Sequence, residues 1–214
     1  MARLPDSRPL LYYITDRRGL RGEDPLPLVE QAVAAGVDLI QLRERDLSAR
    51  GLLALAEAAQ GRCRGSRTLL LVNDRLDIAL AAGADGLHLP SHGLPVAEVR
   101  RRFPDLLLGA SCHNLDELRR AEEGGADFAV FGPVFETPSK RVYGPPVGLE
   151  RLAEAARAAR VPVLALGGIT LENAGKCLRA GAAGMAAISL FQTSANLVET
   201  VRCLRGLSST PGAG

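Results

Sequence analysis

One short phrase recurs four times along the 214-residue chain, and this recurrence limits the possible folds more than any other feature. Each copy has a glycine typical of a helix end, then a small or acidic residue, then an apolar run too short for a buried helix. The copies lie at 35–43, 82–90, 124–132 and 180–189. Each copy therefore predicts a helix that leads into a short buried strand.

Four further apolar runs lie between the repeats, at 10–14, 68–72, 105–109 and 161–166, which makes eight predicted strands. The segments around them have the period and composition of helices. These helical segments are 27–35, 49–60, 75–83, 94–103, 114–124, 149–159, 169–181 and 196–206. Strands that alternate with helices indicate parallel βα units.

Eight such units in about 200 residues match the lower size limit of a TIM barrel. The main alternative is an open, doubly wound sheet. However, no G-x-G-x-x-G motif follows the first predicted strand, and polar residues follow nearly every strand instead of gathering at one switch point. We therefore expect an α/β fold, a single-domain TIM (β/α)8 barrel over residues 1–207, with a disordered C-terminal tail at 208–214.

The charge and hydropathy of the sequence indicate which classes of partner to expect. Its 26 basic and 24 acidic residues are spread along the sequence, and the short basic clusters at 100–102 and 119–120 fall among helix-forming residues. Such clusters are typical of solvated helix faces, so no nucleic-acid partner is expected. No run approaches the 18 or so apolar residues of a membrane span. We expect a cytoplasmic protein with no membrane partner, and a homo-oligomer is possible.

Residues at the carboxyl ends of barrel strands line the active-site mouth, and in this sequence these positions are unusually polar. The candidates for substrate binding are Gln41, Arg43, Arg45, Asn73, Ser111, Thr137, Ser139 and Lys140. The three cationic side chains among them suit a phosphate or diphosphate group. Ion pairs with neighbouring carboxylates are the alternative role for these cations.

Two segments after the last predicted strands are candidates for phosphate binding. Gly167 and Gly168 follow the seventh strand, and Ile188 and Ser189 end the eighth. Both segments can offer backbone N–H groups and a helix dipole to a phosphate, as is usual in such barrels. The glycines could instead relieve a tight turn.

Three other polar residues have distinct expected roles. His113 follows the fifth strand and is the strongest acid/base candidate, since an imidazole exchanges a proton near neutral pH. The alternative is a histidine that only forms a hydrogen bond at the barrel rim. His88, inside a predicted strand, is more consistent with a packed, hydrogen-bonded structural histidine. Asp74 could hold Mg²⁺, although one carboxylate makes a sparse site. The long loop 131–146, after the sixth predicted strand, is typical of a lid or a binding loop.

Taken together, these residues resemble the thiamine phosphate synthase and TenI family. The motifs that carry the resemblance are YYITD (12–16), QLRERD (41–46), LVNDRLDIAL (71–80), GLHLP (86–90), GASCHNLDE (109–117), FGPVFETPSK (131–140), PVLALGGI (162–169) and AISL (187–190). They extend over nearly the whole chain. The resemblance implies a TIM barrel that binds a small phosphorylated thiazole substrate at its mouth.

The family resembled has two enzymatic branches. The synthase branch joins a pyrimidine diphosphate to a thiazole phosphate with Mg²⁺ and releases diphosphate, whereas the tautomerase branch aromatises a thiazole carboxylate phosphate by moving a proton. The synthase pattern has a second Mg²⁺-binding aspartate where this chain has Gly93, and a lysine at Arg45. The segments 88–95 and 131–140 resemble the tautomerase branch, whose base corresponds to His113.

We therefore expect a TenI-like thiazole tautomerase of thiamine biosynthesis, in which His113 shuttles the proton and no metal cofactor is needed. Residues 73–74 and 137–140 are close to the synthase pattern. The first alternative is thus a thiamine phosphate synthase with Asp74 as its only protein ligand to Mg²⁺. The second is a non-catalytic barrel that binds a thiazole or thiamine phosphate and regulates another process.

Overall fold

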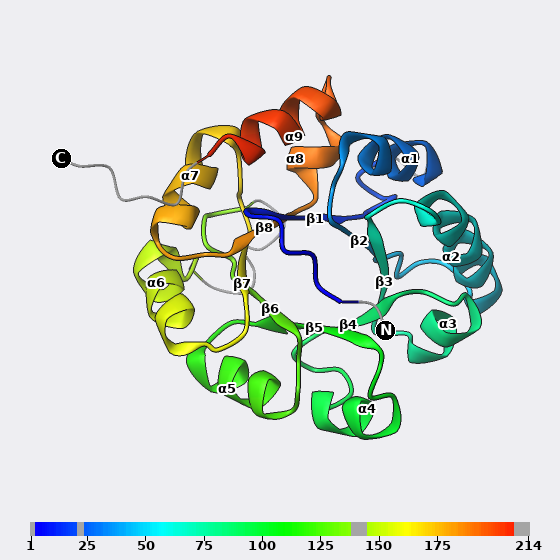
Figure 1. Cartoon of the computed structure of the whole chain (residues 1–214), viewed down its shortest axis with the longest axis horizontal. Coiled ribbons are helices and arrows are strands. Elements are labelled where there is room, and N and C mark those ends of the chain that lie inside the picture. Colours follow the sequence, from blue (N-terminus) through cyan, green and yellow to red (C-terminus); the bar gives the residue numbers. More distant parts are fainter. Residues whose placement is uncertain (1–2, 21–23, 138–144, 208–214) are drawn as a thin grey trace.

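A closed barrel of eight parallel strands forms the centre of the protein, and helices surround it on the outside (Figure 1). The computed structural model describes residues 3–20, 24–137 and 145–207. The strands are β1 (Leu10–Ile14), β2 (Leu39–Leu42), β3 (Leu69–Asn73), β4 (Gly86–Leu89), β5 (Leu107–Cys112), β6 (Phe128–Phe131), β7 (Val163–Leu166) and β8 (Gly184–Ala187). The prediction of a TIM barrel is confirmed. The expected tail at 208–214 lies outside the described residues and stays a prediction.

Helices follow the strands in chain order. They are α1 (Leu26–Ala35), α2 (Ala49–Cys63), α3 (Leu76–Ala81), α4 (Val96–Arg102), α5 (Leu115–Glu123), α6 (Gly148–Ala158), α7 (Leu171–Arg179), α8 (Ser189–Gln192) and α9 (Leu197–Arg205). Each of the eight predicted helices is present with small differences at its ends. The short helix α8 was not predicted, because its four residues are too few to show a period. Among the described residues, no helix is long and apolar enough to span a bilayer.

Side chains alternate along each strand between the barrel interior and the layer beneath the helices. On β1, Tyr12 belongs to the interior cluster with Phe128 of β6, whereas Tyr13 belongs to the outer cluster and contacts Phe191 of α8. The interior cluster consists of Leu10, Tyr12, Ile14, Leu39, Leu71, Leu107, Phe128, Val130, Leu164 and Ala186. The barrel is therefore a packed core with two ends and no pore.

The segment before β1 covers the amino-terminal end of the barrel (Figure 1). Leu4 packs against the interior cluster. The buried carboxylate of Asp38 accepts hydrogen bonds from the backbone N–H of Leu11 at 2.7 Å and from Arg205 of α9 at 2.8 Å. These contacts cover the amino-terminal end of the barrel. Because all eight strands are parallel, their polar carboxyl ends lie together at the other end.

Candidate functional site

A cavity of about 340 Å³ lies at the carboxyl ends of β2 and β3. Its walls are formed by Glu44, Arg45, Leu47, Leu52, Asn73, Asp74, Arg75 and His92. Three residues predicted to bind substrate or metal, namely Arg45, Asn73 and Asp74, are thus brought together. The cavity offers carboxylate, amide and guanidinium groups within one hollow, which suits a charged, phosphorylated ligand.

Asp74 directly follows β3 and has an uncommon backbone conformation, with φ at 63°. Its backbone N–H donates a hydrogen bond to the His88 carbonyl oxygen at 2.9 Å, and its side chain is exposed. Non-glycine residues in the left-handed region cost energy and are enriched at functional sites. Its place on the cavity wall is consistent with such a site.

Gly93 lies directly against Asp74. A Cβ atom added at Gly93 would be 2.8 Å from Oδ1 of Asp74, so the position where the synthase pattern has its second aspartate is in contact with the first. Across the described part of the chain, no group of three or more His, Cys, Asp or Glu side chains could hold a metal ion. Mg²⁺ is commonly bound by one or two carboxylates plus water and substrate phosphates, so Asp74 alone fits a Mg²⁺ ion carried by a diphosphate.

The carboxylates beside Arg45 have other partners. Glu44 is buried and accepts hydrogen bonds from Thr15 Oγ1 at 2.5 Å and from the Arg17 backbone N–H at 2.9 Å. Asp46 forms an ion pair with Arg17 at 2.6 Å. Among the described residues, no ion pair is formed by Arg45, so the predicted alternative of pairing with its sequence neighbours is not observed. Its charge remains available to a ligand in the cavity.

Four polar side chains form a hydrogen-bonded chain across the barrel interior. Gln41 Nε2 donates to the Tyr12 hydroxyl at 2.8 Å, the hydroxyl is 3.2 Å from Nδ1 of His88, and Nε2 of His88 is 2.8 Å from Oγ of Ser111. Two predicted site residues, Gln41 and Ser111, are thereby connected. His88 is buried and hydrogen-bonded, which confirms its structural interpretation. Tyr12 was missed, although its inward position follows from the alternation along β1.

The pKa of His88 predicts a pH dependence of stability. Burial, with a smaller contribution from the charge of Arg43, lowers this pKa from 6.5 to about 3. The unfolded chain therefore binds more protons than the folded chain between these values, and stability falls as the pH falls. We expect His88 to reduce the free energy of unfolding by up to about 1.4 kcal/mol per pH unit below pH 6.

Urea unfolding of the wild type and His88→Gln between pH 4.5 and 7.5 measures this effect. Other titrating groups are common to both proteins, so their contributions cancel in the difference. The difference between the two free energies should change steadily with pH below 6 and be flat above 7. A difference that stays constant over the whole range would contradict the prediction.

His113 lies just after β5 and is held by a carboxylate. Its Nδ1 atom is 2.9 Å from Glu117 Oε2, and its backbone N–H donates to the same oxygen at 2.8 Å. Although burial raises the pKa of Glu117, the hydrogen bonds from His113 lower it below its usual value. Asn114 caps α5, with its side chain accepting a hydrogen bond from the Glu117 backbone N–H. A solvent-exposed imidazole oriented by a carboxylate can transfer protons, but His113 does not line the cavity described above.

The glycines after β7 are needed for the local backbone. Gly167 and Gly168 have φ values of 99° and 64°, and added Cβ atoms would lie 2.5 Å from Pro133 and 2.7 Å from Phe135. The turn therefore requires glycine whether or not a phosphate binds there. The α8 helix begins at Ser189, with Ile188 before it. Phosphate binding by these four residues stays a prediction.

The loop after β6 is described only in part. Thr137 is half-buried, whereas the predicted substrate-binding residues Ser139 and Lys140 lie outside the described residues. The interpretation of 131–146 as a lid or binding loop is therefore untested.

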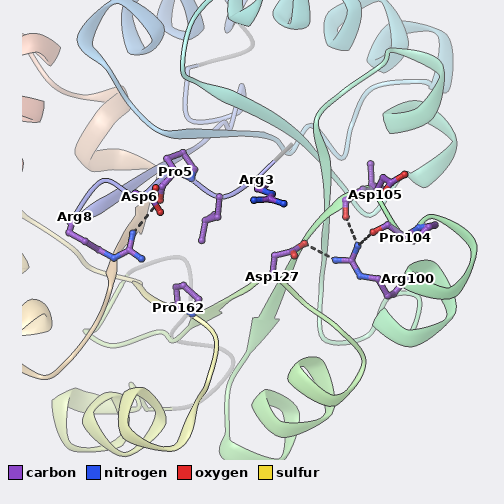
Figure 2. A pocket seen from close by; sticks show the side chains of 11 residues that line it. Arg3, Pro5, Asp6, Arg8, Arg100, Pro104, Asp105, Asp127 and Pro162 are labelled. Atoms are coloured by element: carbon purple, nitrogen blue, oxygen red, sulfur yellow. Dashed lines mark hydrogen bonds and ion pairs between the residues drawn. The ribbon is translucent and has the colours of Figure 1, made fainter. Parts of the chain in front are cut away.

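A second cavity, of about 370 Å³, lies at the opposite end of the barrel, beneath the segment that precedes β1 (Figure 2). Arg100 of α4 forms an ion pair with Asp127 at 2.7 Å and donates hydrogen bonds to the carbonyl oxygens of Gly125, Pro104 and Leu106. None of the predicted site residues lines this cavity. Its contacts connect the loops before β5 and β6, which is a structural role.

Comparison with known proteins assigns this barrel to a family. The model of the thiamine monophosphate synthase family (TMP-TENI) matches residues 11–191. The chain belongs to this family. It is 44% identical over 207 residues to the thiamine-phosphate synthase of Chlorobium luteolum, with 96% of each chain covered. It is 48% identical over 198 residues to a Geobacter sulfurreducens protein provisionally given the same name, with 92% of this chain and 93% of that protein covered.

A solved structure gives the same result. The thiamine phosphate pyrophosphorylase from Pyrococcus furiosus matches with a TM-score of 0.83 and 33% identity, over 93% of this chain and 95% of that one. The family indicated by the sequence motifs is thus confirmed, and the chain is an enzyme of thiamine biosynthesis. These relatives are named as synthases, so they support the first alternative of the sequence analysis more than the expected tautomerase.

Proposed function

We propose that the protein is a thiamine phosphate synthase, which couples hydroxymethylpyrimidine diphosphate to thiazole phosphate and releases diphosphate. The observation that carries the proposal is the cavity in which Asp74, Asn73 and Arg45 meet at the carboxyl ends of the strands. A carboxylate beside a guanidinium group suits a diphosphate that arrives with Mg²⁺. The names of the relatives support the same reaction.

Several residues at the mouth have roles in this reaction. Negative charge develops on the diphosphate as its bond to the pyrimidine methylene carbon breaks, and Arg45 and Arg43 stabilise that charge. Ser111, half-buried at the end of β5, forms a hydrogen bond with the substrate ring, whereas the buried Gln41 holds the Tyr12 hydroxyl in the interior. Backbone N–H groups of 167–168 and 188–189 receive the thiazole phosphate. Asp74 would hold Mg²⁺, which would neutralise the diphosphate when bound.

One experiment tests the proposal. The purified protein is incubated with hydroxymethylpyrimidine diphosphate, thiazole phosphate and Mg²⁺, and thiamine phosphate and diphosphate are quantified separately. We expect equal amounts of the two products, and loss of both when EDTA is added. No product with both substrates present would contradict the proposal.

The position of Gly93 leads to a further prediction. Gly93→Asp would place a second carboxylate against Asp74 and should lower the Mg²⁺ concentration for half-maximal rate by about tenfold, because Mg²⁺ binding strengthens with ligand charge. The matched control is Gly93→Asn, which adds the same bulk beside Asp74 without the charge. The Mg²⁺ dependence of diphosphate release measures both variants. Equal effects of Asp and Asn would show that the position contributes only bulk.

A thiazole tautomerase is the second candidate, because the contact between His113 and Glu117 orients an imidazole at the barrel rim. On this hypothesis His113→Asn lowers the rate of aromatisation by about a hundredfold or more, while binding of the phosphorylated thiazole survives. Aromatisation is followed with the thiazole carboxylate phosphate tautomer alone, without the pyrimidine or Mg²⁺. Unchanged turnover in His113→Asn would exclude this role, and tight binding without turnover in either assay would favour the regulatory alternative.

A further inference from the structure

The hydrogen-bonded chain Gln41–Tyr12–His88–Ser111 crosses an otherwise apolar barrel interior. Its first three members are buried, and the ring of Phe128 lies at 5.5 Å from the Tyr12 ring and at 6.2 Å from the His88 ring, between centroids. Within such surroundings, water is excluded and each polar atom depends on its neighbour in the chain. The hydrogen-bonding groups of these four residues therefore determine which atom donates and which accepts at each step.

The direction of the chain follows from its first member. An amide nitrogen can only donate, so the Tyr12 hydroxyl accepts from Gln41. The buried hydroxyl proton then finds an acceptor only if it points to Nδ1 of His88, 3.2 Å away. An Nδ1 atom that accepts requires the proton of a neutral imidazole to be on Nε2. A histidine whose Nδ1 accepts in this way is neutral, which agrees with its place beside the rings of Tyr12 and Phe128.

The far end of the chain is Ser111, at the carboxyl end of β5. Nε2–H of His88 donates to Oγ of Ser111 at 2.8 Å, so this oxygen acts as an acceptor toward the interior. The proton of the Ser111 hydroxyl is then left for a partner on the other side. Ser111 is only half-buried, and its strand ends at the mouth of the barrel.

We propose that His88 is a positioning residue that fixes the Ser111 hydroxyl as a hydrogen-bond donor toward the bound substrate. The site would then select a substrate with an accepting atom at this place, such as an unprotonated ring nitrogen. The inference rests on the proposed function only in taking the substrate to bind beside Ser111. Its first part, the tautomer of His88, concerns the free protein and can be tested separately.

The tautomer is measured by two-dimensional NMR of the protein labelled with ¹⁵N-histidine, in which the two neutral tautomers have different nitrogen shifts. The protein has three histidines, so His88→Gln is sufficient to assign the signal of His88. We expect His88 in the Nε2–H form near pH 7. The Nδ1–H form would overturn the proposal, because Ser111 would then have to donate to Nε2 and could not donate to substrate.

The effect on substrate is measured by a double-mutant cycle. We expect Ser111→Ala to raise KM about tenfold, which is the usual effect of one lost hydrogen bond to substrate, and Tyr12→Phe to raise it a few-fold. The double variant should be no worse than Ser111→Ala, because Tyr12 acts on substrate only through Ser111. Independent, multiplicative effects on KM would contradict the relay and indicate a merely structural role.

Tyr13→Phe is the matched control. Tyr13 is the next residue on β1 and equally buried, but its hydroxyl has no hydrogen-bond partner in the described structure and faces the outer layer. We expect no change in KM or in the His88 tautomer. If the wild type catalyses aromatisation instead of coupling, the proposed function fails, and the same cycle is then measured in the aromatisation assay. If neither assay shows turnover, the same cycle is measured on the dissociation constant of hydroxymethylpyrimidine diphosphate, and independent effects of Tyr12→Phe and Ser111→Ala would again contradict the relay.

Discussion

Asp74→Asn is expected to lower the rate of diphosphate release about a thousandfold, which is the upper range for the loss of one electrostatic group at an active site. The cavity contains two carboxylates. Glu44 is held by Thr15 and Arg17, whereas Asp74 has no such role in stabilising the described part of the fold. An asparagine keeps the shape of the side chain but removes the charge that would hold Mg²⁺. The fold should be unaffected because Asp74 is exposed.

Steady-state rates at several Mg²⁺ concentrations check this expectation. Part of the lost rate should return at high Mg²⁺, since the diphosphate itself contributes ligands to the ion. Asp105→Asn provides the matched control, because it makes the same change of charge at the opposite end of the barrel. A loss of less than about tenfold in Asp74→Asn would remove Asp74 from the mechanism.

The barrel was predictable because the information that determines it is local. Each copy of the repeated phrase contains both a helix end and a strand, as at Gly36 and β2 or at Gly181 and β8. Gly36 and Gly181 adopt positive φ values, where glycine has no steric penalty. Once eight parallel strands are recognised, the carboxyl ends of the strands indicate where ligands bind.

The parts of the site that could not be predicted depend on contacts between distant segments. The chain from Gln41 to Ser111 joins four strands, and no local pattern shows that Tyr12 meets His88, 76 residues further along. Ion pairing with neighbouring carboxylates such as Glu44 is the alternative role for Arg43 and Arg45, yet the hydrogen bonds of Glu44 go to Thr15 and to the backbone of Arg17. Such pairings are decided by packing across the barrel mouth.

The contact between Asp74 and Gly93 shows how sequence and structure complement each other. The family pattern indicates that the second aspartate is missing, but only the structure places residue 93 against Asp74. The synthase branch can therefore be tested in this one cavity, whereas the tautomerase branch is tested at His113, which lies outside it. Gly93→Asp adds a carboxylate to this cavity and Asp74→Asn removes one. The Mg²⁺ dependence of the first variant and the rate of the second therefore both test the synthase reaction.

The second large effect concerns the closure of the barrel at Gly184. This residue begins β8 and pairs with Leu10 of β1 and with Leu164 of β7, so it joins the last strand to the first. A Cβ atom at Gly184 would overlap the backbone carbonyl oxygen of Leu10. Backbone atoms of a paired strand cannot move aside without breaking the hydrogen bonds that close the barrel.

We therefore expect Gly184→Ala to lower the free energy of unfolding by about 3 kcal/mol or more. For a chain of this length that corresponds to a fall in melting temperature of roughly 10 °C. Gly61→Ala is the matched control, because Gly61 lies in α2 with nothing within 4 Å of an added Cβ. In that helix the same substitution should stabilise by about 0.5–1 kcal/mol.

Thermal and urea unfolding of the two variants and the wild type measure both the expected destabilisation by Gly184→Ala and the expected stabilisation by Gly61→Ala. Failure of Gly184→Ala to accumulate as folded protein would agree with the prediction, provided that Gly61→Ala folds normally. A melting temperature of Gly184→Ala within about 2 °C of the wild type would mean that β1 and β8 can separate without loss of stability. The two strands would then not limit closure of the barrel, and the need for glycine at this position would have to come from β7 instead.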